Sequence, residues 1–443
     1  MSKRLLLVSC RSPFLESDRI YPPLGLLYLK SSCALQIPDV KVDVVDDYDL
    51  ENPDIFEPYD YIGVSIMTPQ REEANKLLVL IKEKWPEKIV IGGGPHVLHY
   101  CDDIINDPWD FLVKGDGENL LPKIIKGEDV PRVSYEFISR VDLANQPRPD
   151  RLGEAAFLSN YKYRLKDLNA TTMLTGRGCP MACKFCEDAR TTTRWTSMEN
   201  TKQELEDIVA MGYKGVYLFD DLFAINLRKC QPYLDLLKAS GLKFRCNVHA
   251  KFMTDEFAAA LADSGCIEVA FGAESGSQAM LDRMDKKTSV QQNYDCAKHC
   301  KKYGITVKAF LMIGLPGETL ETVKDTEKFI LTSGIDDAQI AIYYPYKGTQ
   351  FRQEMDDGVA DDLFMEDKPE GLGFYGGKDG SSDSIVRTAA LSSEELIEIR
   401  EDLIKKYKFA THTTRHEDDD KFFDTHLETD PEYTGGGDVG CHT

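Results

Sequence analysis

The sequence of 443 residues lacks any apolar run approaching the length of about 20 residues that a membrane-spanning helix needs. Its N-terminal stretch, MSKRLLLVSC, has an apolar core too short for a signal peptide, and the charged RSPFLESDR follows at once. We interpret this stretch as a first β-strand. We therefore expect a cytoplasmic protein without a membrane partner.

Positive charge is also scarce, because 53 Lys and Arg stand against 75 Asp and Glu, giving a formal net charge of -22. Binding a nucleic-acid backbone needs a basic face, so we expect no nucleic acid as the main partner. Part of the acidic excess lies in residues 411–443, which show no periodicity. We predict that this acidic tail is disordered.

The N-terminal part alternates strand-like and helical patterns. Strand-like runs occur at residues 4–10, 42–46, 61–68, 88–94 and 111–115. Continuous apolar strands separated by helices predict a parallel sheet covered on both faces. Such sheets bind ligands in the loops beyond the carboxyl ends of their strands. We assign residues 1–125 to this α/β domain of flavodoxin or Rossmann type, and residues 126–170, which lack sustained periodicity, to a linker.

A second strand–helix series begins at Thr171. Its predicted strands are residues 171–178, 215–221, 243–249, 267–275, 307–314 and 338–345. Six strands are too few for the closed eight-stranded barrel, so we predict a partial (βα)6 barrel over residues 171–350. Residues 351–410 follow as a small, mostly helical C-terminal region, with one clear helical pattern at 392–408.

Three cysteines stand directly after the first strand of this second series. They are Cys179, Cys183 and Cys186 in GRGCPMACKFC. Thiolates select zinc or iron–sulfur clusters, and a structural zinc site has four closed ligands. No fourth Cys or His lies nearby in the sequence. A [4Fe–4S] cluster normally takes four cysteines, so three would leave one iron open to a substrate or cofactor. Structural zinc stays the alternative interpretation.

The C-x3-C-x2-C spacing, with the aromatic Phe185 before the last Cys, resembles the radical S-adenosylmethionine superfamily. In that family the open iron binds the amino and carboxylate groups of S-adenosylmethionine. One electron then splits the sulfonium and yields a 5′-deoxyadenosyl radical. The resemblance implies a [4Fe–4S] cluster, S-adenosyl-L-methionine and an external one-electron reductant of flavodoxin or ferredoxin type.

The same resemblance implies roles for residues at other strand ends. Asp220 and Asp221, in LFDD, resemble the family position near the methionine amino group. Glu274, in FGAESGS, resembles the glutamate that reaches the adenosyl portion. Gly314 and Gly317, in GLPGET, would let the backbone approach the adenine. A solvated pair or helix cap is the alternative for the aspartates, and a tight turn for the glycines.

Three more positions carry weaker signals. Arg245 and His249 on the predicted strand 243–249 would point into the same region, and placement on the surface is equally compatible with the pattern. Tyr344 and the segment PYKGTQF resemble a family PxPGT element in which Lys347 replaces the second proline. Because of that departure we assign no role to this segment.

Three stretches of the first domain, PPLGLLYL, IGGGPH and DFLVKGDGEN, together resemble the cobalamin-binding domain found ahead of radical S-adenosylmethionine domains. The resemblance covers residues 1–345 and implies cobalamin as a further cofactor. The DxHxxG histidine that coordinates cobalt in many such domains is absent, and the domain's only histidines are His96 and His99. We therefore expect an open or water-filled lower axial position.

The cobalamin resemblance points to two groups of residues. Ser65 and Thr68 would hydrogen-bond the nucleotide tail, and Gly92, Gly93 and Gly94 would admit the backbone close to it. Capping explains the two hydroxyl residues equally well. An ordinary strand-to-helix turn explains the three glycines.

Taken together, the resemblances imply a cobalamin-dependent radical S-adenosylmethionine methyltransferase, of class B type, that methylates an unactivated carbon of a small-molecule or peptide-derived substrate. One alternative is a cyclase or rearrangement enzyme that uses cobalamin without methyl transfer. Another is a cobalamin-binding sensor with a vestigial cluster, against which the intact cysteines and Glu274 count. No motif specifies the substrate.

Overall fold

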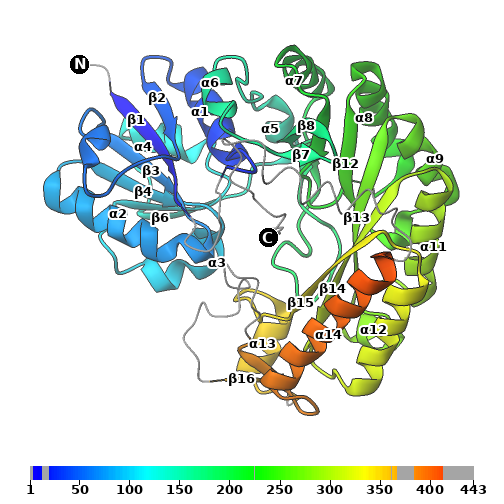
Figure 1. Ribbon diagram of the computed structural model, residues 1–443. Coiled ribbons are helices and arrows are strands. Elements are labelled where there is room, and N and C mark those ends of the chain that lie inside the picture. Colours follow the sequence, from blue (N-terminus) through cyan, green and yellow to red (C-terminus); the bar gives the residue numbers. More distant parts are fainter. Residues whose placement is uncertain (1–2, 12–18, 224, 361, 367–383, 413–443) are drawn as a thin grey trace. The chain divides into compact units, whose positions relative to one another are not determined.

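The computed structural model describes residues 3–11, 19–223, 225–360, 362–366 and 384–412 (Figure 1). The predicted acidic tail lies outside the described residues from position 413 onward. The chain divides into two compact units. Of the described residues, the first comprises 3–11, 21–162 and 194–212, and the second comprises 19–20, 163–193 and those from 213 onward. Among the described helices, none combines the length and apolar character that a membrane crossing requires.

The first unit contains a six-stranded parallel sheet in the order β2-β1-β3-β4-β5-β6. Its strands are β1 (Arg4–Ser9), β2 (Lys41–Val45), β3 (Tyr61–Ser65), β4 (Ile89–Gly93), β5 (Phe111–Gly115) and β6 (Val133–Glu136). The first five lie where the apolar runs predict them. The sixth lies inside the segment 126–170 that we predicted as a linker, and Val133 pairs with Leu112 of β5. Its four residues are too few to show periodicity.

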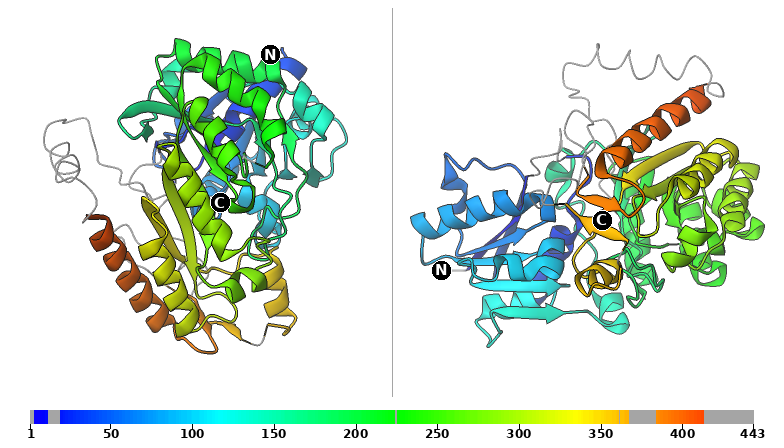
Figure 2. Two further views of the ribbon diagram at one scale, coloured as in Figure 1. Left: turned by 90° about the vertical axis from the view of Figure 1, so that its right-hand side faces the viewer. Right: turned by 90° about the horizontal axis from the view of Figure 1, so that it is seen from below.

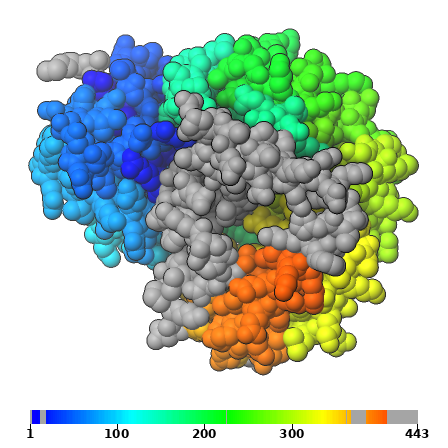
Figure 3. Space-filling view, viewed as in Figure 1, coloured from blue at the N-terminus to red at the C-terminus, as the bar shows by residue number. Residues whose placement is uncertain are grey.

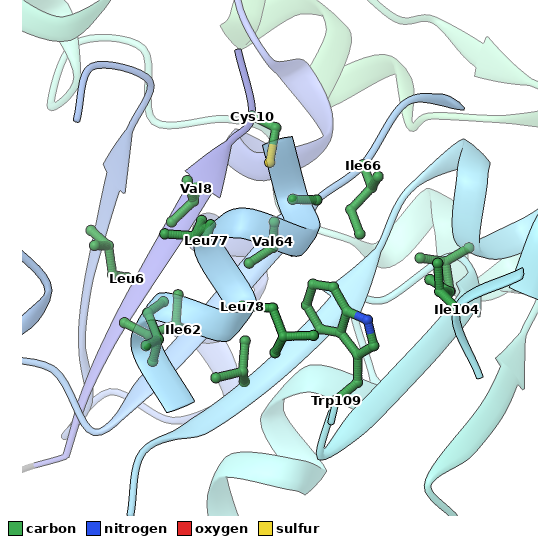
Figure 4. Close-up of a cluster of buried hydrophobic side chains, with 14 of the residues drawn as sticks. Leu6, Val8, Cys10, Ile62, Val64, Ile66, Leu77, Leu78, Ile104 and Trp109 are labelled. Carbon is green, nitrogen blue, oxygen red and sulfur yellow. The ribbon is translucent and has the colours of Figure 1, made fainter. Parts of the chain in front are cut away.

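Helices cover both faces of this sheet. They are α1 (Leu24–Gln36), α2 (Arg71–Lys84), α3 (Pro95–Ile104) and α4 (Leu120–Lys126), with shorter turns η1 (Pro53–Phe56), η2 (Thr68–Gln70), α5 (Arg140–Asn145) and α6 (Ala155–Leu158). Successive residues of a strand point to opposite faces. Leu5 and Leu7 therefore pack with residues of α1 and α4, whereas Leu6 and Val8 pack with residues of α2 and α3 (Figure 4). The parallel sheet is buried on both sides, as predicted.

Helix α7 (Met198–Ala210) belongs to the first unit, although its sequence lies between two strands of the second. The Arg151 side chain, 0% exposed, forms an ion pair with Glu204 of α7, 3% exposed, at 2.6 Å between Nη2 and Oε1. Arg194, in the short strand β10 (Arg194–Trp195), forms a second buried ion pair with Asp116 after β5. These pairs tie residues 194–212 to the first unit, which interrupts the predicted barrel segment of residues 171–350.

The second unit contains a curled, seven-stranded sheet in the order β15-β14-β13-β12-β11-β8-β7 (Figure 1). Its strands are β7 (Arg164–Leu165), β8 (Leu168–Met173), β11 (Gly215–Leu218), β12 (Lys243–Val248), β13 (Cys266–Glu274), β14 (Thr306–Ile313) and β15 (Asp337–Ile342). Only the β7–β8 pairing is antiparallel. In a parallel sheet all carboxyl strand ends lie at one edge, and Asp220, Glu274 and Gly314 stand at the ends of β11, β13 and β14.

Helices follow most strands of this sheet. They are α8 (Leu227–Ser240), α9 (Asp255–Asp263), α10 (Gln278–Arg283), α11 (Val290–Lys302), α12 (Leu320–Thr332), α13 (Gln350–Asp356) and α14 (Ser393–His412), with the short helix η3 (Ala250–Phe252). The unit also contains the short strand β9 (Gly176–Arg177) and the antiparallel pair β16 (Leu363–Met365) and β17 (Val386–Thr388). The predicted helix 392–408 corresponds to α14, which lies beside β15 and α12 (Figure 1). Figure 2 shows it as the orange to red helix, and Figure 3 shows its atoms in orange next to yellow ones. Arg400 donates to the carbonyl of Ile340 at 2.8 Å, and Lys406 pairs with Glu327 at 2.9 Å.

Candidate functional site

The three motif cysteines gather in the loop that follows β8. Cys183 is buried, and Cys179 and Cys186 are partly buried in the same apolar cluster, next to Met181 and Leu222. Burial raises the pKa of all three thiols, that of Cys179 to about 11. Thiols in such surroundings ionise when a metal neutralises them, so the donor set suits a soft metal centre.

Within the described residues, no three His, Cys, Asp or Glu side chains converge on a single metal ion. A structural zinc site has four ligands around one ion. A [4Fe–4S] cluster is bound through a separate iron by each cysteine, so its three thiolates stand farther apart. The three thiols of this loop match the number of protein ligands of a cluster with one open iron.

Backbone hydrogen bonds hold the start of this loop. Gly178 has a φ of 90°, and an added Cβ would lie 2.6 Å from the carbonyl oxygen of Thr192, so only glycine fits there. Its N–H donates to Asp221 Oδ2 at 2.7 Å. The Cys179 N–H donates to Thr191 Oγ1 at 2.8 Å, and the Thr191 N–H returns a bond to the Cys179 carbonyl at 2.9 Å.

Lys184 anchors the middle of the loop, a role that the sequence pattern did not reveal. Its N–H donates to the Met284 carbonyl at 2.9 Å, and its carbonyl accepts from the Phe351 N–H at 3.0 Å. Its Nζ pairs with Glu354 at 2.8 Å. Phe351 and Glu354 belong to α13, which begins at Gln350 inside PYKGTQF, so the segment to which we gave no role supports the cysteine loop. Tyr344, directly before that segment, is buried.

Asp220 and Asp221 both bind the chain that leads into the cysteine loop. Asp220 is buried and accepts from the Thr175 N–H at 2.7 Å and from the Thr175 hydroxyl. Burial raises the pKa of Asp220 to about 7. Asp221 is exposed and accepts from Gly178. Asp220 is therefore neither solvated nor a helix cap, because its partner Thr175 lies in the chain after β8. A role of the pair near the methionine amino group stays a prediction.

Glu274, the last residue of β13, forms a buried ion pair that the sequence did not predict. Its Oε1 lies 2.5 Å from Lys286 Nζ, and both side chains are less than one-tenth exposed. Glu274 has a φ of 60°, and the residues flanking Lys286, Asp285 and Lys287, have φ values of 54° and 57°. Gly272 lies next to the pair, because an added Cβ there would collide with both charged atoms.

Positive φ is unfavourable for residues with a side chain, and such strain concentrates at functional sites. Lys286 Nζ also lies 5.5 Å from the ring centroid of Phe185, the residue that stands between Cys183 and Cys186 in the sequence. Burial opposes the positive charge of Lys286, but Glu274 and the nearby thiols raise its pKa above the usual value. The lysine therefore stays protonated beside the cysteine loop.

His249, just beyond β12, fixes the turn that carries Lys286. Its Nδ1 accepts from the Lys251 N–H at 3.2 Å, so its Nε2 carries the proton and donates to the Lys286 carbonyl at 3.2 Å. Burial lowers the pKa of His249 to about 3, and the positive charge of Lys286 adds to the shift. The imidazole is therefore neutral.

Arg245 lies four residues before His249, in the body of β12 rather than at the strand end. It is 3% exposed, so the surface alternative is wrong for this residue. Its Nε lies 3.1 Å from Glu268 Oε1, and its guanidinium stacks 4.4 Å from the Tyr217 ring centroid. These contacts hold the guanidinium inside the second unit, and a cofactor contact stays a prediction.

The two glycines after β14 have φ values of 81° at Gly314 and 84° at Gly317. An added Cβ at Gly314 would lie 3.0 Å from Leu396 of α14, and one at Gly317 would lie 3.2 Å from the Arg283 side chain. Both glycines are therefore required by the turn itself. Glu318 is buried, which raises its pKa to about 7, and it accepts from the Thr322 hydroxyl at 2.5 Å.

In the first unit, the three predicted glycines differ in their surroundings. An added Cβ at Gly92 would lie 3.2 Å from the Trp109 ring, and one at Gly94, whose φ is 97°, would lie 2.9 Å from backbone atoms of Ile66. Packing and the turn explain these two glycines. Gly93 has no such neighbour, because the nearest protein atom would be 3.7 Å away. Of the three, Gly93 best suits the approach of a ligand.

Ser65, Thr68 and the histidines His96 and His99 of the first unit lie at or after the carboxyl ends of β3 and β4. Ser65 ends β3, and Thr68 Oγ1 lies 3.4 Å from Nδ1 of the buried His96, which stacks on Tyr100. Thr68 does not cap η2, whose N-cap residue is Met67. Burial and nearby Lys114 lower the pKa of His99 to about 4.

Comparison with known sequences gives two kinds of match. The family model described as the Radical SAM superfamily matches residues 173–330. An uncharacterized methyltransferase of Pyrococcus horikoshii is 30% identical over 362 residues, which cover 74% of this chain and 77% of that protein. The anaerobic magnesium-protoporphyrin IX monomethyl ester cyclase of Rubrivivax gelatinosus is 25% identical over 327 residues, which cover 68% of this chain and 59% of that protein.

Solved structures share the fold. The radical S-adenosylmethionine methyltransferase TsrM from Kitasatospora setae, with cobalamin and a [4Fe–4S] cluster bound, gives a TM-score of 0.71 at 17% identity, covering 91% of each chain. The cobalamin-dependent S-adenosylmethionine radical enzyme OxsB with aqua-cobalamin bound gives 0.64 at 20% identity, covering 81% of this chain and 56% of that chain. With its cysteine motif, its family-model match and its methyltransferase relative, the chain belongs to the radical S-adenosylmethionine superfamily of enzymes.

Proposed function

We propose that the protein is a cobalamin-dependent radical S-adenosylmethionine methyltransferase that methylates an unactivated carbon of a small-molecule or peptide-derived substrate. The observation that carries this proposal is the gathering of three thiols in one braced loop after β8, beside the buried Glu274–Lys286 pair. The methyltransferase relative and the fold shared with TsrM and OxsB support it.

The proposed domain order is a cobalamin-binding domain, a linker, a partial barrel of six βα units and a helical C-terminal region. The proposed boundaries are 1–125, 126–170, 171–350, 351–410 and, for the acidic tail, 411–443. TsrM, which matches over 91% of the chain and has cobalamin and a [4Fe–4S] cluster bound, supports the presence of parts that bind these two cofactors. The strand β6 and the helix α7 indicate that the first domain also takes up residues beyond position 125.

We assign the cluster ligands to Cys179, Cys183 and Cys186. When bound, the cluster supplies the electron that cleaves S-adenosylmethionine, and cobalamin supplies methyl transfer. Asp221 and Thr191 would keep the loop in shape through backbone bonds. Asp220, Glu274, Gly314 and Gly317 would line the S-adenosylmethionine site, and Ser65, Thr68 and Gly93 would contact cobalamin.

The proposed partners are a small-molecule or peptide substrate and an external one-electron reductant of flavodoxin or ferredoxin type. TsrM has been solved with tryptophan bound, which supports a small-molecule substrate for this chain. We also place the protein in the cytoplasm, because a reducing compartment keeps the motif thiols free to bind iron.

The test is anaerobic purification of the full chain with iron and cobalamin supplied, followed by incubation with S-adenosylmethionine and dithionite. We expect both 5′-deoxyadenosine and S-adenosylhomocysteine as products. The Cys183→Ala variant should form no 5′-deoxyadenosine. Because cobalt methylation by S-adenosylmethionine releases S-adenosylhomocysteine, that product separates the methyltransferase from its rivals.

The other outcomes would select the rival functions. 5′-Deoxyadenosine without S-adenosylhomocysteine would favour the cyclase or rearrangement enzyme, a name that the Rubrivivax relative carries. Bound cobalamin with neither product would favour the sensor. Either result would overturn the methyltransferase proposal.

A further inference from the structure

Lys286 is a buried cation placed against the cysteine loop. Only 8% of its side chain is exposed, and its Nζ lies over the ring of Phe185 in the middle of the C-x2-C segment. The turn that carries it is bonded to the same segment, because the Lys184 N–H donates to the Met284 carbonyl at 2.9 Å. The lysine and the loop are therefore held together by backbone as well as by side chains.

The chain accepts unfavourable backbone to keep this charge in place. Asp285, Lys287 and Glu274 all have positive φ, a backbone conformation that is unfavourable for residues with a side chain. His249 adds a hydrogen bond to the Lys286 carbonyl. A buried ion pair alone does not explain this arrangement, because apolar residues of similar volume stabilise a core as well or better.

A fixed positive charge near an iron–sulfur cluster favours its reduced form, because reduction adds one negative charge to the cluster. We propose that Lys286 is a positioning residue that holds a positive charge beside Cys183 and Cys186 and thereby raises the reduction potential of the cluster, while Glu274 limits the effect. The inference rests on the proposed cluster. The step that it assists is the transfer of one electron from the external reductant to the cluster.

The test is the midpoint potential of the reconstituted cluster, followed by electron paramagnetic resonance without S-adenosylmethionine. Lys286→Met should lower the equilibrium constant for one-electron reduction at least tenfold, a shift of about 59 mV to more negative potential. Lys286→Arg should stay near the wild-type potential. Glu274→Gln should shift it in the opposite direction, because the lysine charge is then less neutralised.

The matched control is Lys287→Met in the same turn. Lys287 is the next residue and itself has a positive φ, but its side chain is 56% exposed and pairs with Asp285, so solvent screens its charge. This variant should keep the wild-type potential. If Lys286→Met does not fold, the arginine and glutamine variants carry the test.

An unchanged potential in Lys286→Met, or a loss of iron with no change in the potential of the remaining clusters, would overturn the inference and leave Lys286 a structural residue. Weaker binding of S-adenosylmethionine at an unchanged potential would also overturn it, in favour of a ligand contact. Absence of any cluster from the wild-type protein would instead refute the proposed function.

Discussion

The buried pair of Arg151 and Glu204 gives a stability prediction with a large expected effect. Arg151 donates from Nε at 2.8 Å and from Nη2 at 2.6 Å to the same carboxylate oxygen, and neither side chain is more than 3% exposed. Arg151→Met would leave the Glu204 carboxylate buried without its cation. Breaking a buried pair in this way costs about 3–5 kcal/mol of unfolding free energy.

The assay is urea unfolding followed by tryptophan fluorescence. Trp85, Trp109 and Trp195 are the chain's 3 tryptophans, and all lie in the first unit, so the signal reports on that unit. Lys202→Met is the control on the same helix, because its pair with Glu206 is exposed at 3.8 Å and contributes at most about 1 kcal/mol.

Replacing both partners, as Arg151→Met with Glu204→Leu, should recover most of the loss, because no charge then stays buried. The reasoning is refuted if Arg151→Met lowers the unfolding free energy no more than Lys202→Met does.

Three further predictions concern single residues. Because His249 stays neutral in the fold to about pH 3 while the unfolded chain protonates near pH 6.5, lowering the pH from about 7.5 to about 5.5 should cost about 1.4 kcal/mol. His249→Gln should remove that part of the pH dependence of the unfolding free energy, measured by urea unfolding with circular dichroism because His249 lies in the second unit and the tryptophans in the first; an unchanged pH dependence would contradict the prediction. Gly94→Ala should destabilise the first unit by more than about 1 kcal/mol by fluorescence, because φ is 97° there, whereas Gly25→Ala, with open space around it, should not. Asp221→Ala should lower the iron bound per chain, because it removes the side-chain oxygen that accepts from the Gly178 N–H. Asp221→Asn keeps an oxygen there and should bind as much iron as the wild type. Equal iron in the two variants would contradict a role of this hydrogen bond in holding the cysteine loop.

Local sequence patterns are sufficient to predict the positions of the main strands and of the loop that carries the three cysteines. Apolar runs predict a buried parallel strand directly, and the three thiols lie within eight residues of one another. Lys286 could not be found this way, since a lysine in LDRMDKKTS is typical of a solvated turn. Its burial depends on Glu274, twelve residues earlier, and on the position of the cysteine loop.

The predictions that were wrong concern features that contacts between distant parts of the sequence determine. Helix α7 was assigned to the barrel because of its place in the sequence, whereas two buried ion pairs tie its segment to the first unit. The strand β6 is defined by pairing with β5 and not by its own composition. Gly92 suggested a close ligand, yet its neighbour is Trp109, which lies seventeen residues further along the chain.

The central claim is that three cysteines bind a cluster in which one iron has no protein ligand. Electron paramagnetic resonance of the reduced, reconstituted protein with and without S-adenosylmethionine tests it most directly. We expect iron and sulfide contents of one [4Fe–4S] cluster per chain and a signal whose g values change when S-adenosylmethionine is added. A signal that ignores S-adenosylmethionine, or full cluster content after Cys179→Ala, Cys183→Ala or Cys186→Ala, would contradict the claim.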